Sequence, residues 1–446
     1  MYRLAFATFL LVVSACSKPG YDIGILAGTL IDGSGSTPQT NKLILIKDGK
    51  IAAIKDGNEK DNYKMTSFID AHDQFIIPGL YDMHGHITMS QRTYKIENGT
   101  FQATVAYDQG DAEWSMKSLL YYGITSVRET ADFLEEGLAL QKATASGSLP
   151  GPNIFTCGPL IECSPAEFAT MSTVVNSPEE ARAEVRRQVN AGVDFIKIYS
   201  TVPTPIMKAV IEEAHLLHKK VIGHLGASTW RQAVDADIDD LVHPGPFCDT
   251  SLANLNADST KAMLALMAKK QIANDPTLIV MKACYNVPYG DSLVKTYPFT
   301  IPSGVLRSWD EENDFLWAYL GHEYDYRSDF TSYLNFTKVA YTMGVKLLVG
   351  SDFNNENVIP GYSLHQELQL MSQAGIPNDV LIRMATHDAA QWLGVLGESG
   401  TIEEGKRADL IILHKNPLED ISNTMQIDQV FFKGVLLDRN SLVARK

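Results

Sequence analysis

The chain has 446 residues, of which 45% are hydrophobic and 20% are charged, and its formal net charge at pH 7 is -15. This composition is typical of a folded protein with one large domain and a smaller one, and it excludes a disordered chain. The acidic balance argues against a nucleic-acid partner, which requires concentrated Lys and Arg. Beyond the N-terminus, no apolar run reaches the roughly 18 residues of a membrane-spanning helix.

The first residues predict an export signal. A basic residue precedes an apolar run over residues 4–13, which is too short to span a membrane but typical of a signal peptide. The following Val13-Ser14-Ala15-Cys16 resembles a bacterial lipobox, so we expect residues 1–15 to be removed and Cys16 to carry a lipid anchor. Ser17, rather than Asp, in the next position predicts the outer membrane of a Gram-negative cell, facing the periplasm. A plain secretory signal or a disordered start is the alternative.

Short strands are predicted near both ends of the mature chain. Asp48-Gly49 and Lys433-Gly434 are turn signals within segments that alternate in hydrophobicity or are rich in β-formers. These segments are residues 25–31, 42–47, 50–54, 409–413 and 430–437. Strands at both ends that flank a long middle predict one small β-sandwich, built from residues 16–75 and 399–446.

The middle of the chain, residues 76–398, alternates between predicted strands and helices. Ser177-Pro178 and Thr204-Pro205 are good helix starts. The candidate strands are residues 80–83, 124–128, 153–157, 193–199, 221–223, 240–242, 277–281 and 345–350. Strands that alternate with helices are typical of a parallel sheet, so the fold class is α/β. Eight such units predict a closed (β/α)8 TIM barrel, and a doubly wound open sheet is the alternative.

Polar residues of metal-ligand type close several of these apolar runs. His84 and His86 are separated by one glycine, and side chains two apart in a strand share a face, so both imidazoles can bind one metal ion. In a barrel the reacting groups sit at the carboxyl ends of the strands. Lys197 inside an apolar strand is costly as a free ammonium ion, which a metal-bound or neutralised form avoids. The residues at this rim are His84, His86, Lys197, His224, His243 and Asp352.

These motifs resemble the amidohydrolase superfamily, in the group of imidazolonepropionase- and prolidase-related metal-dependent hydrolases. The resemblance rests on residues 78–86, 123–128, 350–352, 385–390 and 400–410, and it runs from about residue 25 to residue 437. It implies two divalent metal ions, zinc in the first place, bridged by a carboxylated Lys197. His84, His86 and Asp352 would hold the first ion, and His224 and His243 the second.

The implied chemistry is hydrolysis by a hydroxide that two metal ions activate, with Asp352 moving its proton. Tyr199 is the candidate for contacting a substrate carbonyl or carboxylate, and packing at the rim is the alternative. Arg128 could bind a substrate anion, but an ion pair with Glu129 or another neighbour is the preferred interpretation. Cys157, Cys163, Cys248 and Cys284 are expected to be core thiols or to include one disulfide bridge.

Two regions depart from what the resemblance implies. Residues 160–165 lack the glycine- and histidine-rich pattern of dipeptidase-like relatives, so substrate contacts there do not carry over. A long insertion between His243 and Asp352 includes the aromatic-rich residues 285–329, which predict a lid or a specificity loop.

The sequence therefore predicts a lipid-anchored hydrolase of the bacterial cell envelope. Its small-molecule substrate would contain an amide-type C–N bond, as in an N-acyl amino acid, a dipeptide or a cyclic amide. A lactone or phosphotriester hydrolase with the same site is the first alternative, and a non-catalytic surface lipoprotein is the second. We expect no nucleic-acid partner and contact with a membrane only through the anchor.

Overall fold

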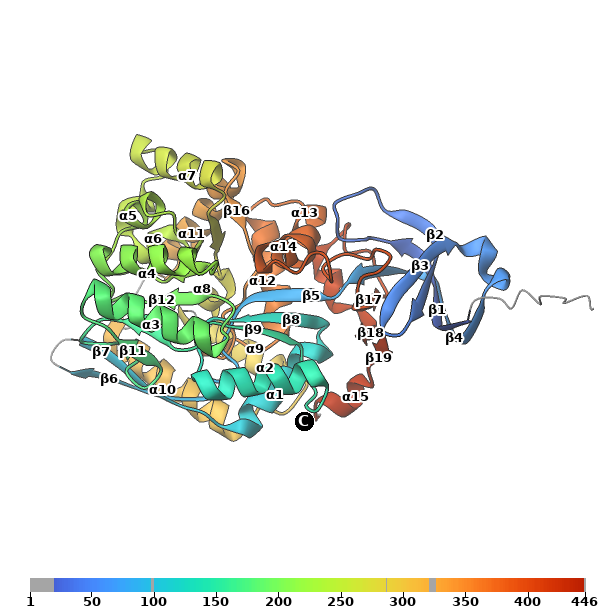
Figure 1. The fold of residues 1–446 in the computed structure, drawn as a ribbon, viewed down its shortest axis with the longest axis horizontal. Coiled ribbons are helices and arrows are strands. Elements are labelled where there is room, and N and C mark those ends of the chain that lie inside the picture. The colour runs from blue at the N-terminus through green and yellow to red at the C-terminus, as the bar shows by residue number, and fades with distance from the viewer. Residues whose placement is uncertain (1–19, 98–99, 286, 321–325, 445–446) are drawn as a thin grey trace, which may run out of the picture.

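The computed structural model describes residues 20–97, 100–285, 287–320 and 326–444 (Figure 1). It is an α/β fold, as predicted. The expected signal segment and Cys16 lie outside the described residues, so the cleavage site and the anchor stay predictions. Within the described ranges, none of the helices combines the length and the apolar character that a membrane crossing requires.

The two ends of the chain meet in one seven-stranded sheet, ordered β19-β18-β17-β4-β1-β2-β3. In Figure 1 its blue and red strands lie side by side at one end of the molecule. Only β1 and β4 pair in parallel, and Asp48 and Gly49 turn the β2–β3 hairpin with positive φ angles of 49° and 75°. The strands are β1 (Gly20–Leu30), β2 (Gln39–Lys47), β3 (Lys50–Asp56), β4 (Lys64–Pro78), β17 (Leu410–Leu413), β18 (Ile427–Phe432) and β19 (Val435–Leu436).

This terminal sheet curls until its two halves share a core. The N–H of Ala408 donates to the carbonyl of Gly49 (3.0 Å), and the N–H of Gly434 donates to that of Ala408 (2.9 Å). Ile44 and Phe431, from opposite halves, are fully buried in the same apolar cluster. The predicted joining of the two chain ends is therefore observed, whereas the two-layered sandwich and the exact domain limits stay predictions.

Parallel strands in two further sheets fill the middle of the chain. One sheet has the order β5-β8-β9 and the other the order β11-β10-β12-β13-β14-β15-β16. The strands are β5 (Leu80–Gly85), β8 (Ile124–Glu129), β9 (Asn153–Thr156), β10 (Leu160–Glu162), β11 (Ser172–Val174), β12 (Ile196–Ile198), β13 (Val221–Gly223), β14 (Asp240–Val242), β15 (Ala273–Asp275) and β16 (Lys346–Leu347).

Backbone hydrogen bonds connect these two sheets at both sides. The N–H of Asp194, just before β12, donates to the carbonyl of Thr156 in β9 (2.8 Å). The N–H of Met83 in β5 donates to the carbonyl of Val349, just after β16 (2.9 Å). The carboxyl ends of β5 and β16 therefore lie side by side.

Helices follow most of these strands. Ser177 caps α3 by accepting the N–H of Glu180 (3.2 Å), as predicted. The helices are α1 (Gln109–Tyr121), α2 (Leu134–Ser146), α3 (Pro178–Ala191), α4 (Thr204–Leu216), α5 (Trp230–Asp235), α6 (Gly245–Cys248), α7 (Asp258–Lys270), α8 (Leu278–Tyr285), α9 (Val287–Thr296), α10 (Ser303–Leu320), α11 (Tyr326–Thr342), α12 (Tyr362–Gln373), α13 (Asn378–Arg383), α14 (Ala389–Leu393) and α15 (Arg439–Leu442).

The strand predicted at residues 277–281 is wrong. The strand is β15, which ends at Asp275, and the predicted segment lies in helix α8 apart from its first residue. Pro276 cannot donate to a strand neighbour, and Thr277 turns the chain with φ +43°. The N–H of Ile279 then donates to the buried carboxyl group of Glu367 (2.7 Å). These contacts outweigh the β preference of the segment, which depends on context.

One hairpin was not predicted. Strands β6 (Gln91–Glu97) and β7 (Thr100–Ala106) pair in antiparallel fashion after His86. Helix α10, from the predicted insertion, packs against β6. The hairpin and the inserted helix therefore lie together beside the end of β5.

Candidate metal centre

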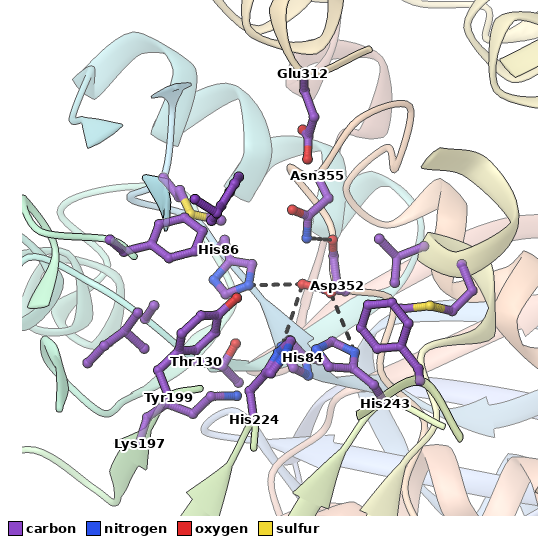
Figure 2. Close-up of a pocket in the computed structure, with 18 of the residues that line it drawn as sticks. His84, His86, Thr130, Lys197, Tyr199, His224, His243, Glu312, Asp352 and Asn355 are labelled. Atoms are coloured by element: carbon purple, nitrogen blue, oxygen red, sulfur yellow. Dashed lines mark hydrogen bonds and ion pairs between the residues drawn. The ribbon is translucent and has the colours of Figure 1, made fainter. Parts of the chain in front are cut away.

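The six predicted metal ligands converge on one pocket of about 290 Å³. Figure 2 shows His84, His86, His243 and Asp352 joined by dashed lines, with Lys197, Tyr199 and His224 on one side of them and Glu312 and Asn355 on the other. All six side chains and Tyr199 line this pocket. The residues came from five different strand ends in the sequence, so their convergence is a property of the fold.

Asp352 lies at the centre of the first group. Its Oδ1 lies 2.9 Å from Nε2 of His86 and 3.5 Å from Nε2 of His84. Burial by itself raises the pKa of the Asp352 carboxyl, but its contacts with His84 and His86 and the nearby Lys197 outweigh burial and hold the pKa below its usual value. Asp352 is therefore an ionised carboxylate.

Two glycines let the strands that carry these groups approach each other. A Cβ atom on Gly85 would lie 2.0 Å from the ring of Phe353, and one on Gly350 would lie 2.7 Å from Cβ of His84. The N–H of Asp352 donates to the carbonyl of His84 (2.8 Å), which fixes the two ligand segments against each other. The glycine between the histidines is thus a steric requirement of the site.

His243 and His224 form the second group. Their ring centroids are 4.6 Å apart, and those of His243 and His84 are 5.3 Å apart. His243 has a left-handed backbone (φ +68°), its N–H donates to the carbonyl of Asp275 (2.8 Å), and its Nδ1 lies 2.7 Å from Oγ1 of Thr277. One ligand atom each from His84, His243 and Asp352 lies within 4.8 Å of the others, so the two groups adjoin each other.

Lys197 on β12 is buried and lines the same pocket. Burial lowers the pKa of its ammonium group, although Asp275 raises it. Among the described residues, Lys197 has neither a hydrogen-bond acceptor nor an ion-pair partner. The neutral amine, which is the form that can add carbon dioxide, is therefore easier to reach than on an exposed lysine.

The donor set fits divalent cations. Burial lowers the pKa of all four histidines, that of His224 to about 3, so they are neutral near pH 7 and have the form that binds metal ions. Nδ1 of His86 is buried without a hydrogen-bond partner in the part of the chain that the structure describes. Four imidazoles, a carboxylate and an amine thus line one pocket.

Behind His84 lies an ionic cluster that the sequence analysis missed. Oδ2 of Asp275 lies 2.9 Å from Nδ1 of His84 and 2.7 Å from Nη2 of Arg128. Nη1 of Arg128 lies 2.7 Å from Oδ2 of Asp240, and its guanidinium stacks on Trp392 at 4.5 Å. Arg128 is fully buried, so it does not bind a substrate anion; the predicted ion pair exists, but with these aspartates and not with Glu129.

Glu129 has a different part in the site. Its carboxyl group accepts the N–H groups of Ile87 (2.6 Å) and Thr88 (3.0 Å), the residues that follow His86. Asp82 accepts the hydroxyl of Ser351 (2.5 Å), next to Asp352. Asp82 stands two residues before His84 in the sequence, and Glu129 is the last residue of strand β8; these positions are the signals that could have identified them.

The remaining predicted residues are placed as follows. The ring of Tyr199 lies 4.5 Å from that of His224, and burial raises the pKa of its hydroxyl. Its contact with a substrate stays a prediction. Cys157, Cys163 and Cys248 are free thiols, so no disulfide joins these three residues.

Known proteins are similar to this chain over most of its length. A family model described as "Amidohydrolase family" matches residues 75–282 and 331–437. The chain is 25% identical to ochratoxinase from Aspergillus niger, over 89% of this chain and 82% of the relative. It is also 25% identical to imidazolonepropionase from Thermoplasma volcanium, over 89% and 90%. A crystal structure of a Xaa-Pro dipeptidase with bound methionine superposes with a TM-score of 0.69 at 25% identity, covering 93% of this chain and 99% of that one.

Proposed function

Because the chain belongs to the amidohydrolase family, we propose that it uses a two-metal centre to hydrolyse an amide-type C–N bond of a small molecule. The prediction of a hydrolase for carbon–nitrogen bonds is confirmed at the level of the family and its relatives. The binuclear mechanism and the substrate are the parts proposed here.

We propose that the parallel strands close into a (β/α)8 barrel. An open, doubly wound sheet leaves two edge strands unpaired, whereas here backbone bonds connect β9 to the start of β12 and β5 to the end of β16. The eight strands of the barrel would be β5, β8, β9, β12, β13, β14, β15 and β16. The ligand side chains would then share the carboxyl rim, where such barrels place their active sites.

In this proposal His84, His86 and Asp352 hold one divalent cation, and His224 and His243 hold a second. Carboxylated Lys197 would contribute a ligand to both ions, and zinc is the metal that the histidine-rich donor set favours. Bound there, the cations supply an activated water as nucleophile and polarise the carbonyl of the substrate.

The chain's own groups carry out the rest of the reaction. Asp352 accepts the proton of the attacking water and returns it to the leaving nitrogen, so that water and amide become an acid and an amine. Tyr199, whose ring lies beside that of His224, would donate a hydrogen bond from its hydroxyl to the substrate carbonyl. The apolar pocket walls exclude other water and strengthen these interactions.

The observation that carries the proposal is the convergence of six ligand-type side chains on one pocket. Chelation should abolish amide hydrolysis, and zinc with bicarbonate should restore it. Lys197→Ala should lose metal as well as activity, while Lys47→Ala, an exposed lysine on β2, should lose neither. Full metal content and full activity in Lys197→Ala would contradict the bridging role. A panel that includes lactones and phosphotriesters tests the alternative bond types.

We also propose that Cys16 anchors the mature protein in the bacterial envelope, on the grounds of the lipobox-like Val13-Ser14-Ala15-Cys16. Cys16→Ser should move the protein from the membrane fraction to the soluble periplasmic fraction. Retention of that variant in the membrane fraction would contradict the proposal.

A further inference from the structure

Aromatic side chains form one wall of the pocket. This aryl wall consists of Tyr94 on β6, Phe101 on β7, Phe168 between β10 and β11, and Phe315 on α10. Ring centroids are 5.5 Å apart for Tyr94 and Phe315, 5.4 Å for Phe101 and Phe315, and 6.1 Å for Phe101 and Phe168. Three separate chain segments therefore contribute rings to one surface that opens onto the metal ligands.

A second apolar wall is built from different elements. Phe247, Val280 and Met281 line the pocket beside His243, and the ring centroids of Phe247 and His243 are 5.8 Å apart. These three side chains pack with the main core, whereas Tyr94, Phe101 and Phe168 pack with a separate cluster around Leu160. The metal ligands thus lie between two apolar surfaces, so each half of a bound amide meets one of them.

Apart from the proposed metal centre, the described residues that line the pocket offer no cation for a substrate carboxylate. Among its described lining residues, Lys197 is the one Lys or Arg, and it lies among the metal ligands. The nearby guanidinium of Arg92 is used inside the protein, because it lies 2.9 Å from Glu312 and donates to Asn355 (2.7 Å). Glu312 itself lines the pocket as an acid.

A carboxylate bound against such walls would lose its hydration, and the nearby guanidinium of Arg92 is already paired with Glu312. An uncharged group does not have this desolvation cost. Aromatic groups gain additional energy from stacked or edge-on contacts with other rings at centroid distances of about 4.5–7 Å. The lining therefore selects by charge as well as by shape.

Resting on the proposed amide hydrolysis, we infer that the substrate is an uncharged amide with an aryl group against the aryl wall and a second apolar group on the other side of the scissile bond. Free dipeptides and N-acyl amino acids, which the sequence alone left open, carry a carboxylate and are poor substrates. The enzyme is selective for neutral, apolar amides.

A matched pair of compounds tests the selection by charge. N-phenylacetyl-phenethylamine and N-phenylacetyl-phenylalanine differ only in one carboxylate. For the zinc-loaded protein, kcat/KM should be at least about tenfold higher for the neutral compound, which corresponds to one unpaired polar group. An equal or higher kcat/KM for N-phenylacetyl-phenylalanine would overturn the inference. If neither amide is hydrolysed, the amidase proposal fails. Calorimetric binding of the same two compounds still tests the selectivity, and equal or tighter binding of the carboxylate compound would overturn the inference.

Variants of the aryl wall test the selection by shape. Phe101→Ala should raise KM for the aryl amide about tenfold with little change in kcat, because it removes ring contacts but no reacting group. The same variant should leave the N-acetyl analogue nearly unaffected. Phe101→Leu keeps most of the volume and should show a smaller rise in KM. Phe68→Ala, on exposed β4 (42% exposed), is the matched control. Equal effects of Phe101→Ala on both amides would overturn the assignment.

Discussion

The contact between Asp275 and His84 makes a sharp prediction about metal binding. Oδ2 of Asp275 accepts from both Nδ1 of His84 (2.9 Å) and Nη2 of Arg128 (2.7 Å), and all three side chains are buried. This hydrogen bond holds the proton on Nδ1 of His84. The lone pair of Nε2 is then free to face the pocket. Partners of this kind are worth about 10- to 100-fold in metal affinity.

Asp275→Asn keeps the shape of the side chain and removes its charge. Hydrogen bonds to charged groups contribute about 1.5–3 kcal/mol each, and the asparagine oxygen can retain one of the two, so we expect a loss of about 2 kcal/mol in the free energy of unfolding. Arg128 retains Asp240, which limits the damage. Asp275→Ala should cost about 3–5 kcal/mol, because it leaves half of a buried ionic cluster uncompensated.

The assay pairs urea denaturation of the metal-free protein with titration of zinc against a competing chelator. Burial raises the pKa of Asp275 to about 7 against the pull of Arg128, so the comparison is made on the alkaline side of neutrality, where the wild-type carboxylate is ionised. Asp409→Asn is the matched control, since Asp409 is a buried aspartate paired with Arg407 (2.6 Å) in the terminal sheet. If Asp275→Asn and Asp409→Asn bind zinc equally well, the reasoning about His84 is refuted.

Three further predictions follow from individual contacts. Gly85→Ala should destabilise the protein by about 1–3 kcal/mol and reduce its metal content, because the new Cβ would lie 2.0 Å from Phe353. Gly397→Ala has open space around it and should have neither effect. Unchanged urea midpoints for both variants would contradict this prediction. Arg92→Met should cost about 3–5 kcal/mol by leaving buried Glu312 without its cation, and a loss no larger than that of an exposed arginine would argue against the pairing. Chelation should lower the melting temperature, because an ion bound at 100 times its Kd stabilises the folded state by about 2.7 kcal/mol; a scan that does not shift would indicate an empty centre.

The convergence of the six candidate ligands could be predicted from the sequence because each leaves a one-dimensional trace. His224, His243 and Asp352 each follow a short apolar run, and the side chains that end such runs in parallel strands meet at one edge. Asp275 has the same position at the end of β15. It was missed because residues 277–281 are richer in β-branched and apolar side chains than β15 is. The strand was therefore predicted a few residues after its true position.

The pocket walls could be predicted only in part. The aromatic character of the insertion was evident, and Asn98-Gly99 between β6 and β7 is a hairpin signal that went unused. Nothing local indicates that Phe101 faces Phe315, because these rings come from a hairpin and a helix far apart in the chain. Contacts of this kind depend on tertiary packing, which composition and periodicity do not encode.

The backbone at the site supports the same conclusion as its side chains. His243, Asp352 and Asn354 have left-handed φ angles of 68°, 60° and 72°, and such conformations cost about 1–3 kcal/mol each for residues other than glycine. Lys197 adds the cost of burying an ionisable group that has no hydrogen-bond or ion-pair partner among the described residues. Backbone strain and desolvation at one point destabilise the folded protein unless a bound group offsets them, and cations held by these donors would do so. The predicted fall in melting temperature on chelation measures this stabilisation directly, independently of any substrate.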